Sequence, residues 1–211
     1  NLEFNYGEYS ATPSNTRKFG VILKSNNNSW DFTKFARDHE YEKKIYNVLK
    51  NLGLNLKNGK ITLQGSEFFS WVNLNFLVLK EVGIEIIQKK HSENDNEYFI
   101  GTNTLEFTIQ EEADWFDLKG KVKIGNHEMK FLDLRHYILS DIHEILLPDG
   151  KIAIIPDEWF ARLSGIFKSS GGNASVNLQK YHLGLIENLC STPTASFHFD
   201  EKFHDLDKLK V

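Results

Sequence analysis

Lysine and arginine side chains are concentrated near the start of the chain, where they could bind phosphate groups. Residues 17–60 contain ten basic and four acidic residues, a net charge of +6, whereas residues 61–211 carry −8. Lysine contacts to a phosphate backbone give binding that is independent of base sequence and weakens with salt. The alternative is an ordinary solvated surface. The candidate nucleic-acid-binding residues are Arg17, Lys18, Lys24, Lys43, Lys44 and Lys50.

Carboxylates are densest in the segment from Glu111 to Asp117. Glu112 and Asp114 would share one face of an extended strand, where their oxygens could hold Mg²⁺ or Ca²⁺. The plainer interpretation is a solvated segment at the start of a strand, and we assign no metal ligand. A second group with metal-binding side chains, interpreted in the same way, consists of His198, Asp200 and His204.

Motifs for nucleotide binding and nucleophilic catalysis are missing from the sequence. The three Gly-Lys pairs that begin at residues 59, 120 and 150 are followed by Ile or Val. A phosphate-binding loop needs Ser or Thr there to bind Mg²⁺. Cys190 ends an apolar stripe, so we interpret it as a small buried side chain and not as an activated thiolate. We therefore assign no catalytic and no cofactor-binding residue.

The overall composition is that of a folded protein. The 211 residues carry a net charge of −4, and 13% are aromatic, which supplies large side chains for a core. The single cysteine excludes an internal disulfide framework, and no apolar run reaches the roughly 18 to 20 residues of a membrane span. We expect a cytoplasmic protein without a membrane partner. Because the chain begins at Asn1 and shows no signal peptide, we interpret it as a fragment of a longer protein.

These side chains are predicted to lie in an α+β fold with mixed or antiparallel sheets and about five helices. Apolar residues at helical spacing predict a helix over residues 37–52, with Asp38 as its N-cap and Gly53 as its end. Its opposite face would carry Lys43, Lys44, Asn47 and Lys50. Gly150, between two β-branched runs, predicts a hairpin over residues 144–155.

The remaining helices and strands follow from the same periodicities. A second helix over residues 66–81, with Ser66 as its N-cap, is apolar on several sides and should be more deeply buried than the first. A strand over residues 115–124 should bend near Asp117. Further helices are predicted at 131–140, from Pro156 onward, and at 176–189. Short strands are predicted at residues 2–9, 19–24, 59–64, 84–89, 98–100 and 105–109.

This pattern predicts two lobes and a tail. Residues 1–102 form an N-terminal α/β lobe, and residues 103–191 form a C-terminal α+β lobe with the hairpin and two helices. Residues 192–211 are predicted to be a tail or linker, because this charged segment has little to pack.

Several motifs occur in combination along the chain. They are Asp114-Trp-Phe-Asp-Leu118 with the strand that follows to Gly125, Phe131-Leu-Asp-Leu-Arg135, Leu147-Pro-Asp-Gly-Lys151, Ile155-Pro-Asp-Glu-Trp159, and Arg37-Asp38 with Glu42. Together they resemble the helicase-associated region of bacterial Swi/Snf-type ATPases, which belong to helicase superfamily two. The resemblance covers roughly residues 30–190.

The resemblance implies a non-catalytic accessory module of a DNA-dependent ATPase, with double-stranded DNA and its own motor domain as partners. The motor, with its ATP and Mg²⁺, would lie beyond Val211, because the family's catalytic motifs match nothing here. The full-length protein would then be an ATP-dependent helicase or translocase. Trp115, Phe116 and Trp159 are interpreted as structural.

Two other functions stay open. The acidic balance of residues 61–211 is compatible with a protein–protein interaction module that has no DNA contact. An independent hydrolase that uses Glu112 and Asp114 with a metal is the third interpretation.

Overall fold

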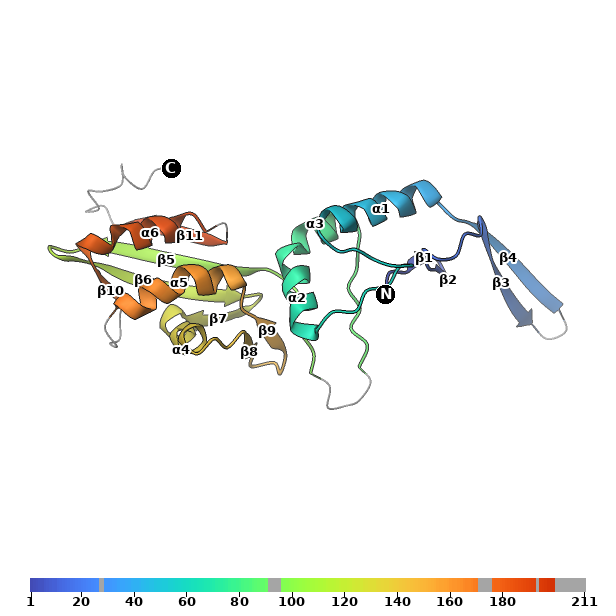
Figure 1. Cartoon of the computed structure of the whole chain (residues 1–211). Helices are drawn as coiled ribbons and strands as arrows, with labels where there is room; N and C mark the ends of the chain where they lie inside the picture. The colour runs from blue at the N-terminus through green and yellow to red at the C-terminus, as the bar shows by residue number, and fades with distance from the viewer. Residues whose placement is uncertain (27–28, 91–95, 171–175, 193, 200–211) are drawn as a thin grey trace. The chain divides into compact units, whose positions relative to one another are not determined.

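The computed structural model in Figure 1 divides into two compact units. Unit 1 is Asn1–Gln64 and unit 2 is Gly65–Val211, so the division precedes the change near residue 102 that the sequence suggested. Helices and mostly antiparallel sheets confirm the predicted α+β class. The residues that the structure describes are 1–26, 29–90, 96–170, 176–192 and 194–199.

The described residues of unit 1 form two pairs of antiparallel strands and one helix. Strands β1 (Phe4–Tyr6) and β2 (Tyr9–Ala11) pair across a turn that contains Gly7, which has a φ of 65°. Strands β3 (Phe19–Asn26) and β4 (Ser29–Ala36) form a longer two-stranded ribbon. Figure 1 shows this ribbon extending beyond α1 and the β1–β2 hairpin.

Helix α1 (His39–Asn51) confirms the first predicted helix. The side chain of Asp38 accepts a hydrogen bond from the backbone N–H of Tyr41 at 2.9 Å and caps the helix. Ile45 and Leu49 are buried on one side, and the chain leaves the helix through Gly53, which has a φ of 87°. The side of the helix opposite Ile45 and Leu49 therefore faces solvent.

Unit 2 is built on a five-stranded sheet with the order β10-β6-β5-β11, and β7 pairs with β6. The pairs are antiparallel except β11–β5, which is parallel. The predicted bend near Asp117 is wrong, because β5 and β6 pair continuously and Phe116, Leu118, Val122 and Ile124 are all buried. The strands are β5 (Asn103–Glu111), β6 (Trp115–Ile124), β7 (His127–Lys130), β10 (Val176–Gln179) and β11 (Ala195–Phe199).

Three helices of unit 2, α4, α5 and α6, and the hairpin over residues 144–155 enclose one hydrophobic core with this sheet. Phe107 contacts Phe131 edge-on with ring centroids 4.8 Å apart, and Phe131 stacks on Phe167 at 4.7 Å. The predicted hairpin is confirmed as β8 and β9, with Gly150 in its turn at a φ of 82°. These elements are a 3₁₀ turn (Phe131–Asp133), α4 (Leu134–Leu139), β8 (Glu144–Leu146), β9 (Ile152–Ile154), α5 (Asp157–Ser169) and α6 (Leu183–Cys190).

The second predicted helix is two helices, α2 (Gly65–Leu74) and α3 (Phe76–Glu81), and it begins before Ser66. They meet at Asn75, whose side chain donates to the carbonyl oxygen of Trp71 at 2.9 Å. The expectation of deep burial is wrong, because each helix buries one residue, Val72 and Leu79. Apolar residues on several sides of a helix are covered only where a neighbouring element lies, so Leu74, Leu77 and Val78 stay exposed.

Several other secondary-structure predictions are wrong. Residues 59–64 and 84–89 form no strand, and near residues 98–100 there is only an isolated bridge from Tyr98 to Ile152. The last predicted helix begins at Leu183, because residues 176–179 pair with β6 as β10. Within the predicted tail, β11 pairs with β5, so residues 195–199 belong to the sheet. Positions 200–211 lie outside the described residues.

Candidate nucleic-acid interface

The exposed side of α1 carries the cationic face that the sequence predicted. Lys43, Lys44, Asn47 and Lys50 are all exposed, whereas Ile45 lies on the buried side. Within the described part of the chain, no carboxylate lies within 4.0 Å of the ammonium groups of these lysines. Their charge is therefore available to an external anion.

The other three candidates lie around the β3–β4 ribbon in the same unit. Arg17 and Lys18 are exposed in the segment that leads into β3, and no ion pair of either is found among the described residues. Lys24 differs, because its ammonium lies 2.5 Å from the carboxylate of Glu8. The structure thus places all six candidates on unit 1, and it leaves five of them without a carboxylate partner in the described residues.

Most of the described basic residues of unit 2 are paired with carboxylates, whereas most of those of unit 1 are not. Its described surface contains seven ion pairs between a lysine or arginine and a carboxylate. Unit 1 has ten basic and six acidic residues, a net charge of +4, and unit 2 has a net charge of −8. The pairs are Lys90–Glu97, Lys119–Asp117, Lys121–Glu128, Lys123–Glu106, Lys151–Glu97, Arg162–Glu158 and Lys180–Glu111.

A buried ion pair between Arg37 and Glu42 holds α1 in place. The guanidinium group donates to both carboxylate oxygens, with N–O distances of 2.9 and 2.6 Å, and its side chain is 1% exposed. The hydroxyl of Tyr6 donates to the same carboxylate at 2.6 Å. Arg37 also donates to the carbonyl oxygens of Thr12, Asn15 and Arg17. The pair therefore connects β1, the segment before β3 and the helix.

The protonation of this network follows from its contacts. Burial alone would raise the pKa of the Glu42 carboxyl, but the hydrogen bonds from Arg37 and Tyr6 outweigh burial and hold that pKa below its ordinary value of 4.5. The hydrogen bond to Glu42 raises the pKa of Arg37. Burial and the hydrogen bond to Glu42 raise the pKa of Tyr6. The network is thus a fixed positioning element and offers no free general base.

The burial of Arg37 and Glu42 was not predicted from the sequence, in which the two residues were noted only as part of the family resemblance. A signal for their burial exists in the helical pattern, because Glu42 lies three residues before Ile45 and seven before Leu49. Those spacings put a carboxylate on the apolar side of a helix. A charge in that position needs a partner, and Arg37 precedes the N-cap.

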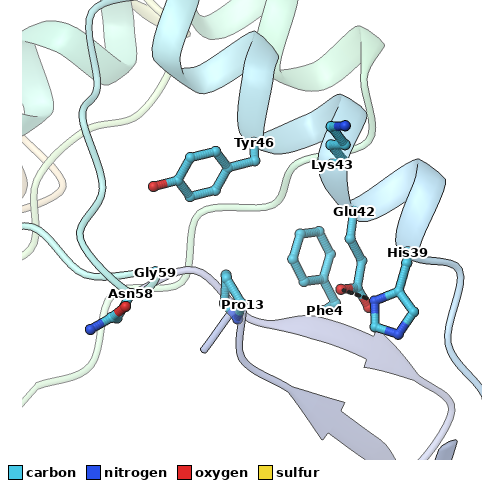
Figure 2. A pocket seen from close by; sticks show the side chains of 8 residues that line it. All are labelled: Phe4, Pro13, His39, Glu42, Lys43, Tyr46, Asn58 and Gly59. Carbon is cyan, nitrogen blue, oxygen red and sulfur yellow. Dashed lines mark ion pairs between the residues drawn. The ribbon is translucent and has the colours of Figure 1, made fainter. Parts of the chain in front are cut away.

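A shallow pocket of about 320 Å³ lies beside this network. Figure 2 shows the aromatic rings of Phe4 and Tyr46 on one side and Asn58 with Gly59 on the other. The imidazole Nδ1 of His39 lies 3.6 Å from a Glu42 carboxylate oxygen, which Arg37 already binds. The pocket therefore adds apolar surface next to Lys43 and no nucleophile paired with a base.

The other chemical candidates are not assembled into a site by the described residues. Glu112 and Asp114 are exposed and lie between β5 and β6, outside either strand. Of their neighbours, Glu111 is paired with Lys180, and Asp117 is paired with Lys119 at 3.1 Å. No group of three or more His, Cys, Asp or Glu side chains in this part of the chain could hold a metal ion. Asp200 and His204 fall outside it. Burial, with a contribution from Glu187, raises the pKa of the Cys190 thiol to about 11, so that thiol is not activated.

Comparisons with known proteins add no further assignment. No family model, no curated protein and no solved structure matches the chain. None of the helices in the described ranges is long and apolar enough to cross a membrane.

Proposed function

We propose that this chain is a non-catalytic accessory module of a cytoplasmic, DNA-dependent Swi/Snf-type ATPase, and that unit 1 binds the phosphate backbone of double-stranded DNA. The observation that supports it best is the exposed face of α1, where Lys43, Lys44 and Lys50 have no carboxylate partner among the described residues. The resemblance of the sequence to the helicase-associated region supplies the class of partner. ATP and Mg²⁺ would belong to the motor domain of the full-length protein.

The distribution of charge favours local binding by unit 1. The chain as a whole is acidic, so attraction to a polyanion must come from a restricted surface. Lysines that are already paired with carboxylates gain little from phosphate, because one favourable contact replaces another. The unpaired lysines of α1 would release counterions from DNA and produce salt-dependent binding without base specificity.

The test is fluorescence anisotropy of a labelled duplex across a salt series. We expect replacement of Lys43, Lys44 and Lys50 by Gln to weaken binding roughly tenfold or more at low salt. It should reduce the slope of log Kd against log salt by roughly 0.9 for each phosphate contact removed. The matched control replaces Lys119, Lys121 and Lys123 by Gln, because this changes the net charge equally on unit 2.

The two variants separate local from general electrostatics. Equal loss in both variants would show that net charge alone governs binding and would remove the role proposed for α1. Absence of binding by the unmodified chain at low salt would reject the DNA-binding proposal.

A second candidate function is a protein–protein interaction module without DNA contact. The exposed apolar side chains of α2 and α3 favour it, since Leu74 is 81% exposed and Leu77 is 67% exposed in a unit of net charge −8. Replacement of Leu74 and Leu77 by Ser would abolish capture of an isolated motor domain if these helices form the contact. The same change would leave duplex binding by unit 1 intact.

A further inference from the structure

The β3–β4 ribbon carries an exposed apolar face. Strand register places directly opposed residues on the same face, and Phe19, Val21 and Leu23 of β3 lie opposite Ala36, Lys34 and Phe32 of β4. Trp30 belongs to the same face, opposite Ser25. Phe32 is 73% exposed and Trp30 is 60% exposed.

The other face of the ribbon is held by unit 1 itself. Gly20 is buried against the ring of Tyr9, and a methyl group at Gly20 would clash with that ring. Tyr9 also stacks on Phe35, with centroids 6.4 Å apart. The apolar face therefore points away from β1 and β2. Because a two-stranded ribbon has no second layer of its own, this face is suited to an external partner.

The charges around this face favour an anionic partner. The ammonium group of Lys34 lies 3.8 Å from the centroid of the Phe19 ring, on the same face. Arg17 and Lys18 precede the ribbon, and neither pairs with a carboxylate of the described chain. A second copy would bring together two units that each carry +4, which disfavours self-association through this face.

We propose that the β3–β4 ribbon binds single-stranded nucleic acid by stacking unpaired bases on Trp30 and Phe32. Lys34 binds an adjoining phosphate, and Arg17 and Lys18, at the other end of the ribbon, bind phosphates further along the strand. Exposed aromatic side chains beside cationic side chains are the combination that holds single strands without base specificity. This inference rests on the proposed function and extends it, because the lysines of α1 bind the duplex backbone and the ribbon binds an adjoining unpaired strand.

The spacing of the two rings favours a single strand over a duplex. Trp30 and Phe32 are two residues apart on β4, a distance of about 6.8 Å along an antiparallel strand. Consecutive bases of one strand in a duplex are about 3.4 Å apart. Consecutive bases could therefore occupy both rings only if the nucleic acid is extended and its bases are unstacked.

The test compares a labelled thymidine 20-mer with a duplex of equal length, using the whole chain. We expect Trp30→Ala with Phe32→Ala to weaken single-strand binding by roughly 10- to 100-fold. Duplex binding should stay within about twofold, because the phosphate contacts on α1 are unchanged. The matched control is Leu77→Ala with Tyr181→Ala, which removes two side chains of unit 2 that are 67% and 79% exposed.

Two further measurements distinguish loss of base stacking from unfolding of the β3–β4 ribbon. Trp30→Phe with Phe32→Tyr keeps both rings and should retain single-strand binding within a fewfold. In the unmodified chain, the thymidine 20-mer should quench the fluorescence of Trp30 on stacking, and Trp30→Phe should remove that quenching. The slope of log Kd against log salt should be the same in the Trp30→Ala, Phe32→Ala variant as in the unmodified chain.

The possible outcomes separate this inference from the proposed function. Duplex binding that depends on Lys43, Lys44 and Lys50, together with single-strand binding that Trp30→Ala and Phe32→Ala leave unchanged, overturns the inference alone. Absence of binding to either nucleic acid overturns both. Dimerisation that disappears in the Trp30→Ala, Phe32→Ala variant would assign this face to a second copy and reject the inference.

Discussion

Units 1 and 2 are stabilised in different ways. Unit 2 has a continuous core in which Phe131 contacts both Phe107 of the sheet and Phe167 of α5. Unit 1 buries few apolar side chains, and Arg37 and Glu42 lie among them as a hydrogen-bonded ion pair. A small unit with a small core depends more heavily on any single interaction. We therefore expect the stability of unit 1, but not that of unit 2, to depend on an ion pair.

The surfaces of units 1 and 2 also differ. Unit 2 pairs most of its described basic residues with carboxylates, although Lys80, Lys89, Lys130 and Lys168 are exposed and have no carboxylate partner among the described residues. Unit 1 exposes the lysines of α1 and the aromatic face of its ribbon. On such a surface, cations lack carboxylate partners and large apolar side chains lack a packed neighbour within the protein. This combination is typical of a binding surface.

The largest expected effect is on unit 1 when its buried pair is broken. Arg37→Ala should destabilise unit 1 by about 3–5 kcal/mol, because it leaves the Glu42 carboxylate buried without its main partner. Hydrogen exchange should show the loss as reduced protection of α1 amides, with β5 and β6 unchanged. Lys24→Ala, which breaks the exposed pair with Glu8, is the matched control and should cost less than about 1 kcal/mol. Unchanged protection of α1 would contradict the comparison.

A smaller effect is expected from acid. The pKa of Glu42 is lowered in the folded protein, so its contribution to stability is present above pH 4.5 and is lost as the pH falls through the folded pKa. Protection of α1 amides, corrected for intrinsic exchange, should therefore decline below pH 4.5. Glu42→Gln should be less stable at neutral pH and should lose this part of the decline. An equal acid response in both proteins would show that other carboxylates control unit 1.

The smallest effect is expected from an ion pair of unit 2. Lys123→Gln removes the partner of Glu106 at 2.6 Å, but both side chains are partly exposed to solvent. Such surface pairs contribute about 0–1 kcal/mol, because solvent screens the attraction and both side chains lose freedom. Urea unfolding should shift by no more than that amount. A larger loss would mean that unit 2 also depends on its ion pairs.

Local signals in the sequence were sufficient for several elements. Asp38 before an apolar stripe identified the start of α1, and Gly150 between two β-branched runs identified the β8–β9 turn. Both rest on interactions within a few residues of each other. The exposure of Lys43 and Lys50 followed from the same stripe, since the opposite side of an amphipathic helix faces solvent.

Elements that depend on distant partners were predicted poorly. Residues 176–179 read as the start of a helix but form β10, because β6 supplies an edge with which Val176 and Leu178 can pair. Residues 195–199 were predicted to be part of a tail. They instead form β11, which pairs in parallel with β5, a strand that lies much earlier in the chain. For α2 and α3, apolar composition suggested burial, but Leu74 and Leu77 are not covered by any element of the described residues.

The sequence by itself determined the α+β class, the position of α1 and the side of that helix on which its lysines lie. These properties depend on local propensity and hydrophobic periodicity, which neighbouring residues encode. Only the tertiary structure showed that Arg37 and Glu42 are buried together, that the apolar face of the β3–β4 ribbon is exposed, and that Lys43, Lys44 and Lys50 have no carboxylate partner among the described residues. Burial and pairing depend on which distant segments meet, and hydrophobic periodicity along the chain does not specify those contacts.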